Sequence, residues 1–158
     1  MNDIRNKCVS QNYEILLQLL SLSNTLWEES RIFFAKYKIS PSQFNVLNQL
    51  YENRTGINQI ELSRRLLMHR SNITGLLKRL EKRRYVKRKQ SMQDKRAILV
   101  TISPEGCALV EKILPEFFSL INNIFSNVEI KNRNDFIETL KQIEVNTLCE
   151  ADKLKRTI

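Results

Sequence analysis

The chain has 158 residues, 42% of them apolar, and a formal net charge of +9. This length and composition exclude an intrinsically disordered chain and suit one domain with extensions. With only three glycines and three prolines, long helices are favoured over a loop-rich or all-β fold. The cysteines Cys8, Cys107 and Cys149 form no CxxC pair, so neither a disulfide framework nor a zinc site is predicted. No apolar run reaches the roughly 18 residues of a transmembrane helix, so we expect no membrane partner.

The positive charge is concentrated in one segment. Between Arg70 and Arg96 lie eleven Lys or Arg residues and two acids, Glu81 and Asp94, whereas the rest of the chain carries 15 residues of each sign. One positively charged segment in an otherwise neutral protein indicates a polyanionic partner, most often nucleic acid. The alternative, a solvated helix surface, is the better interpretation for an isolated pair of lysines. It is disfavoured here because the charge continues from a helix into a hairpin.

The first two predicted elements are helices. Residues 10–38 carry apolar side chains at helical spacing, in a stripe too wide to be covered on one side. Ser40 is expected to cap a second helix that begins at Pro41, with Gln43 completing a capping box. This helix should end near residues 53–56, which are typical of a turn.

Two short helices should follow. Asn58 is expected to cap the first, with Glu61 at its third position, and residues 68–70 form a turn. The second, over residues 71–83, has one apolar face made of Ile73, Leu76, Leu77 and Leu80. Its other face carries Asn72, Thr74, Gly75, Lys78, Arg79 and Lys82. Two short helices joined by a tight turn, the second basic on its outer face, are typical of a helix-turn-helix.

After Tyr85 the apolar periodicity changes to two. Residues 86–90 and 97–102 alternate around the polar turn 91–95, which predicts a β-hairpin. Because it flanks the second short helix, we interpret this hairpin as a wing, with Lys89, Lys95 and Arg96 at its tip.

The C-terminal part should be helical. Ser103 is expected to cap a helix that begins at Pro104, and Pro115 should kink or interrupt it. Residues 126–129 predict a further capping box. A last amphipathic helix is expected from the spacing of Phe136, Leu140 and Ile143.

The order of these elements, with several short motifs, resembles the MarR (multiple antibiotic resistance regulator) family over about residues 40–109. Asp94-Lys95-Arg96 resembles the family's Asp-x-Arg wing motif, and Ile102-Ser103-Pro104-Glu105-Gly106 resembles its Leu-Thr-x-x-Gly helix start. The other matching motifs are Leu62-Ser63, Ser71-Asn72-Ile73-Thr74, Leu80-Glu81-Lys82 and Val86-Lys87-Arg88. Arg84 stands where the family often has a glycine, so the left-handed cap there should be less favourable.

The resemblance implies a homodimer in which the first helix and the last two helices of each subunit interleave. It also implies a recognition helix in the major groove of double-stranded DNA and a wing arginine in the minor groove. On that pattern Arg96 is the minor-groove residue and Asp94 holds it in place. The alternative for Asp94 is an ordinary turn-former.

The side-chain chemistry suggests a division of roles. Asn72 and Arg79 are expected to contact base edges, and Gly75 lets the helix approach the groove closely. Ser71 and Thr74 are expected to reach bases or phosphates. Phosphate contacts are expected from Lys78, Lys82, Arg88 and Lys89. His69, the only histidine, is interpreted as a turn residue or a phosphate contact.

Two further features leave alternatives open. The aromatic residues Trp27, Phe33, Phe34, Tyr37 and Phe44 are expected to cluster where the first two helices meet, as core and dimer interface or, alternatively, as a pocket for a small aromatic effector. Cys8 raises the hypothesis of thiol-based redox sensing, although its neighbours do not match the motif of the family's oxidant sensors.

These observations predict a mainly α fold. We expect an N-terminal dimerisation helix over residues 1–38, a winged helix-turn-helix DNA-binding domain over 39–103, and C-terminal dimerisation helices over 104–158. The predicted function is a cytoplasmic, sequence-specific transcriptional regulator, a repressor that acts as a homodimer on a pseudo-palindromic operator and is relieved by a small aromatic ligand. Alternatives are an architectural DNA-binding protein without sequence preference and a protein-interaction module. No set of catalytic residues can be assembled, so neither an enzyme nor a cofactor is expected.

Overall fold

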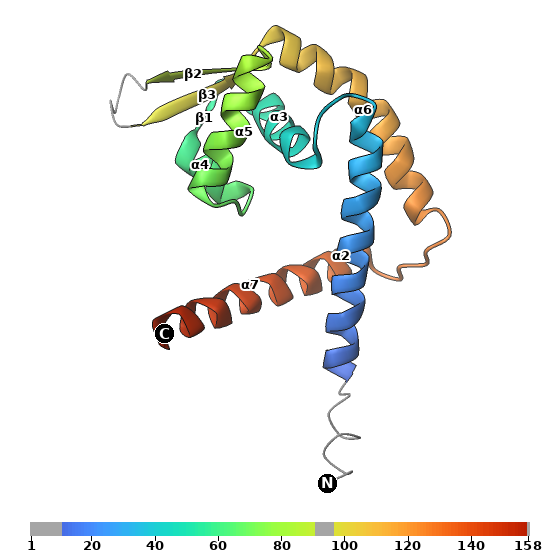
Figure 1. The fold of residues 1–158 in the computed structure, drawn as a ribbon. Coiled ribbons are helices and arrows are strands. Elements are labelled where there is room, and N and C mark those ends of the chain that lie inside the picture. The colour runs from blue at the N-terminus through green and yellow to red at the C-terminus, as the bar shows by residue number, and fades with distance from the viewer. Residues whose placement is uncertain (1–10, 91–96, 158) are drawn as a thin grey trace. The chain divides into compact units, whose positions relative to one another are not determined.

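The computed structural model describes residues 11–90 and 97–157 (Figure 1). Its helices are α2 (Gln11–Ala35), α3 (Pro41–Glu52), α4 (Gln59–Arg65), α5 (Arg70–Lys82), α6 (Pro104–Phe125) and α7 (Arg133–Thr157), and its strands are β1 (Ile57–Asn58), β2 (Val86–Gln90) and β3 (Ile98–Ile102). The predicted mainly helical fold with a wing is confirmed. The chain divides into two compact units, one up to Phe117 and one from Phe118. Among the residues described, no helix is long and apolar enough to cross a membrane.

The helix starts follow local side-chain chemistry. At α3 the Gln43 N–H donates to Ser40 Oγ at 3.2 Å and the Ser40 N–H donates to Gln43 Oε1 at 2.9 Å, which confirms the capping box. At α4 the Ile60 N–H donates to Asn58 Oδ1 at 2.8 Å, so the predicted cap is also confirmed. Glu61 instead binds Arg65, at 3.0 Å.

The wing is part of a three-stranded antiparallel sheet with the order β1-β3-β2. Val86 pairs with Ile102 and Gln90 with Ile98, in the hairpin that the sequence predicts. The third strand was not predicted. It has two residues, Ile57 and Asn58, which pair with β3, and two residues are too few to show an alternating pattern.

The main core lies between the helices and the sheet of the first unit. Its fully buried members include Leu47 and Leu50 of α3, Leu62 of α4, Val86 of β2 and Val100 of β3. The predicted apolar face of α5 is buried in the same core, through Ile73, Leu76, Leu77 and Leu80. This burial leaves the opposite face of α5 free for another function.

A second cluster is aromatic. Phe34 and Phe44 stack with ring centroids 4.5 Å apart, and both contact Phe117 of α6. The predicted clustering holds for Phe33, Phe34, Tyr37 and Phe44. It is wrong for Trp27, which is 49% exposed on α2, because Trp27 precedes Phe34 by seven residues and so lies about two helical turns, roughly 10 Å along the axis, from these rings.

Two predictions concern the C-terminal half. Helix α6 passes through Pro115 without interruption, so of the two predicted effects of this proline the interruption does not occur, and the kink stays a prediction. Helix α7 is capped by Asn132, whose Oδ1 accepts from the Asn134 N–H at 3.1 Å. The predicted capping box over residues 126–129 is therefore wrong, and Ser126 donates its hydroxyl to the Asn123 carbonyl instead.

Helices α2, α4 and α5 are each followed, two or three residues after their last residue, by a non-glycine residue in the left-handed region, namely Lys38, Leu67 and Arg84. At the end of α5 the Tyr85 N–H donates to the Leu80 carbonyl at 3.0 Å and the Arg84 N–H donates to the Glu81 carbonyl at 2.9 Å. This is the Schellman arrangement. Arg84, with φ of 62°, adopts it although glycine is favoured, because both hydrogen bonds and the burial of Leu80 hold the turn.

Replacing Arg84 with glycine is therefore expected to raise the free energy of unfolding by about 1 kcal/mol, because it removes the left-handed strain of an L side chain. Arg84 is exposed, so little packing is lost. Urea denaturation measures the change. Lys78→Gly is the control, since it places the glycine at an exposed position in the interior of α5 and should cost about 1 kcal/mol. Destabilisation by Arg84→Gly would show that the turn carries no strain.

Candidate nucleic-acid interface

Helix α5 presents a polar face opposite its buried one. This face consists of Ser71, Asn72, Lys78, Arg79 and Lys82, all exposed, and we call these five residues the recognition surface. Gly75 lies among them at helical spacing. The structure thus brings these predicted site residues together on one side of one helix. Two polar side chains and three cations on a convex helix suit contact with base edges and phosphates in a major groove.

Thr74 has a different environment. It is half-buried, and its hydroxyl donates to the Arg70 carbonyl at 2.8 Å and accepts from Gln59 Nε2 at 2.9 Å. Gln59 belongs to α4, so this bond links the two helices of the helix-turn-helix. The DNA contact predicted for Thr74 stays a prediction. Gln59 is a positioning residue that sequence analysis missed, because no pattern shows which side chains of two elements meet.

The β2–β3 hairpin extends beside α5 (Figure 1), and an ion pair joins the two. Arg88 Nε donates to Glu81 Oε2 at 2.9 Å, and Arg88 Nη2 donates to the same oxygen. The Arg88 side chain is only 21% exposed. Arg88 therefore anchors the wing to α5, a role that differs from the phosphate contact predicted for it. Lys89, on the same strand, is exposed.

The Arg88 guanidinium holds the pKa of Glu81 below its usual value of 4.5. A carboxyl whose pKa is lower in the folded state stabilises the fold above its unfolded pKa, and this contribution is lost as the pH falls through the folded pKa. Between about pH 6 and pH 3 the native protein should thus lose more free energy of unfolding than Glu81→Gln does. Urea denaturation across this range measures both.

Some acid sensitivity should remain in Glu81→Gln. Hydrogen bonds from its own backbone N–H and from the Ser103 hydroxyl lower the pKa of Glu105, and Lys36 lowers that of Glu116. Both groups are unchanged in the variant. Equal losses in the two proteins would show that the pair with Arg88 does not stabilise the fold.

Several sequence-based expectations concern residues outside the described part of the chain. Asp94 and Arg96 of the wing tip, and Cys8, are among them, so the roles given to these residues remain predictions. His69 is the N-cap residue of α5, and its Nδ1 lies 3.2 Å from Ser71 Oγ. This position, next to the recognition surface, agrees with its interpretation as a turn residue.

Within residues 11–90 and 97–157, no group of three or more His, Cys, Asp or Glu side chains is placed to hold a metal ion. Cys107 is half-buried, and Arg54 Nη1 donates to its Sγ. Cys149 is exposed on α7.

Comparison with known proteins gives consistent results. The MarR family model matches residues 39–98. The HTH-type transcriptional repressor YetL of Bacillus subtilis is 29% identical over 128 residues, which cover 80% of this chain and 77% of YetL.

Comparison with solved structures also finds similar proteins. The MarR protein of Peptoclostridium difficile is 28% identical, with a TM-score of 0.77 over 89% of this chain and 91% of that one. The structure of the Staphylococcus aureus MepR–DNA complex matches with a TM-score of 0.74 at 19% identity, over 85% and 97% of the two chains. With the winged helix described above, these matches show that residues 39–98 form a winged helix of the MarR family and that the chain is similar over most of its length to DNA-binding transcriptional regulators.

Proposed function

We propose that this regulator is a repressor that binds a pseudo-palindromic operator as a homodimer in the cytoplasm and is released by a small aromatic ligand. The observation that carries the proposal is the division of α5 into a fully buried apolar face and the exposed recognition surface. The curated relative YetL is itself a repressor. Two-fold symmetry of the protein implies two half-sites about one turn of DNA apart.

On this proposal the exposed residues have distinct roles. Asn72 and Arg79 contact base edges, and Ser71 supports them. Lys78, Lys82 and Lys89 neutralise phosphates, which positions the helix without specifying sequence. Arg96 enters the minor groove, with Asp94 beside it. The Glu81–Arg88 pair keeps the wing at a fixed place relative to α5.

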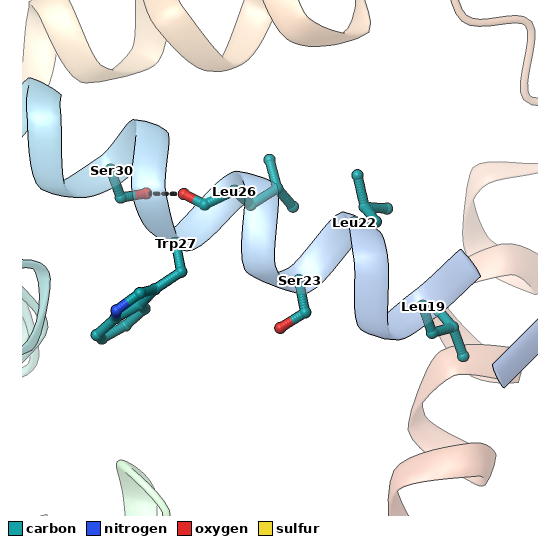
Figure 2. A pocket seen from close by; sticks show the side chains of 6 residues that line it. All are labelled: Leu19, Leu22, Ser23, Leu26, Trp27 and Ser30. Carbon is teal, nitrogen blue, oxygen red and sulfur yellow. Dashed lines mark hydrogen bonds between the residues drawn. The ribbon is translucent and has the colours of Figure 1, made fainter. Parts of the chain in front are cut away.

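The proposed dimer is supported by apolar surface on the N-terminal helix. Along α2 the exposed large apolar side chains include Ile15, Leu16, Leu20, Leu26 and Trp27. An open hollow of about 370 Å³ lies on this helix, lined by Leu19, Leu22, Ser23, Leu26, Trp27 and Ser30 (Figure 2). All six lining residues belong to α2, so the hollow is bounded by a single helix. A helix of a second subunit could pack against it and bury the apolar surface.

Helix α7, in the second unit, has the same character. Phe136, Ile137, Val145 and Leu148 are 47–56% exposed. Surface this apolar favours association, so α7 is proposed to be a second part of the dimer interface.

The proposed effector site is the aromatic cluster at the end of α2. Phe34 and Phe44 fill its interior, and the Tyr37 hydroxyl lies at its edge beside the charged side chains of Lys36 and Glu116. A small aromatic ligand with a polar group could enter between these rings and hydrogen-bond at that edge. Such a ligand would act by favouring a dimer whose recognition helices do not match the half-site spacing. The PcaV regulator of Streptomyces coelicolor was solved in complex with its natural ligand.

The test selects, from a random pool of DNA duplexes, those that the 158-residue chain binds. Sedimentation of the complex then counts the chains bound to each duplex. Recovery of one palindromic motif, bound by two chains, is the expected result. Equal affinity for the recovered and random duplexes would favour an architectural protein. No DNA binding, and no salt dependence, would favour a protein-interaction module. Repeating the selection after thiol oxidation tests the hypothesis about Cys8.

Arg96→Ala is expected to weaken operator binding by about tenfold or more, because it removes a minor-groove cation. Electrophoretic mobility shift measures the affinity, and sedimentation should show an unchanged dimer. Lys155→Ala, at an exposed position on α7, is the control for the loss of one positive charge. Unchanged affinity in Arg96→Ala would remove the wing from the proposed interface.

A further inference from the structure

The only glycine within α5, Gly75, is not required by the fold. It lies in the middle of the helix Arg70–Lys82, where glycine lowers stability relative to alanine. Its φ is not positive, unlike that of Gly56. A Cβ built at Gly75 would meet nothing nearer than Arg79 Nη1, at 3.9 Å. The position is therefore open, and alanine would fit there without strain.

The open position lies at the centre of the recognition surface. The residues three and four places before and after Gly75 are Asn72, Ser71, Lys78 and Arg79, the helical neighbours of a single point on α5. All four side chains are exposed. They surround Gly75 with two polar and two basic groups, and Gly75 itself offers only its Cα, because its backbone N–H and carbonyl lie within the unbroken helix.

We infer that the methyl group of a thymine occupies the open position at Gly75 when the protein is bound to its operator, an inference that rests on the proposed function. A polar base edge placed against Cα would lose its hydrogen bonds to water without replacement. The C5-methyl of thymine is the apolar group that the major groove displays. Asn72 and Arg79 then hydrogen-bond neighbouring bases, and the contact at Gly75 gives the operator a thymine at that place.

The test compares Gly75→Ala with the native protein, using the duplex recovered by selection. The variant should melt about 2–4 °C higher, because alanine favours the helix. Its Kd for the operator should rise by about tenfold, because two methyl groups would compete for one space. Replacing the relevant thymine with deoxyuridine removes the DNA methyl, so it should weaken the native protein and restore most of the affinity of Gly75→Ala.

Asn45→Ala, at an exposed position in α3, is the control and should bind both duplexes as the native protein does. Affinity of Gly75→Ala equal to that of the native protein would overturn the inference, as would a loss that no single thymine-to-deoxyuridine exchange restores. A lower melting temperature for Gly75→Ala would also overturn it, because the fold would then need the glycine. If the native protein selects no duplex at all, the proposed function fails, and the higher melting temperature alone would not support the inference.

Discussion

Gly106→Ala is expected to lower the free energy of unfolding by about 3 kcal/mol. A Cβ at Gly106 would lie 2.2 Å from the Tyr85 carbonyl oxygen and 2.8 Å from Ile102 Cγ1. The carbonyl cannot withdraw easily, because it accepts the Ser103 N–H at 3.0 Å. The first turn of α6 would have to separate from the segment that joins α5 to the wing. Urea denaturation of the full chain measures the loss.

The matched control for this prediction is Gly75→Ala, the same chemical change at the open position on α5, where an increase in stability is expected. Opposite signs at the two glycines would show that local space, and not helix propensity, determines the effect. A change at Gly106 smaller than about 0.5 kcal/mol, the usual range of surface substitutions, would mean that the α6 start can shift without cost.

Arg79→Ala is expected to weaken operator binding by about 1–3 kcal/mol, or roughly 5- to 150-fold, through the loss of a bidentate base contact. The side chain is exposed, so the denaturation curve should remain unchanged. Fluorescence anisotropy with specific and random duplexes measures the affinity. The loss should be larger for the specific duplex, because base contacts specify and phosphate contacts do not.

Arg31→Ala is the control for this second prediction. Arg31 lies on α2 with a side chain that is 61% exposed and forms an ion pair with Glu28, so its removal should leave binding unchanged. Lys78→Ala, by contrast, should weaken binding to all sequences alike. It should also reduce, by about one, the slope of the logarithm of the binding constant against the logarithm of the salt concentration. An equal loss on specific and random duplexes for Arg79→Ala would reassign Arg79 to the phosphates.

The helix starts and the hairpin were predictable because they depend on residues close together in the sequence. Ser40 with Gln43, and Asn58 before α4, cap the helices to which they were assigned. The bounds of β2 match the predicted strand at residues 86–90. The start of α7 was missed because two candidate caps, Ser126 and Asn132, lie close together, and only the path of the chain chooses between them.

For the candidate site, the sequence also predicted which side chains of α5 are buried and which are exposed. The amphipathic spacing of α5 correctly placed Ile73 and Leu77 inside and left Asn72 and Arg79 outside. This follows because a helix with one apolar face can bury only that face.

By itself, the sequence determined which segments are helical, which face of α5 is buried and where the positive charge lies, because propensity, periodicity and charge are local properties. The tertiary structure decided which side chains from different elements meet. It places Arg88 against Glu81, joins Gln59 to Thr74, and brings Phe117 to the aromatic cluster while leaving Trp27 outside it. These contacts depend on how the elements pack together in three dimensions, which no spacing along the chain specifies.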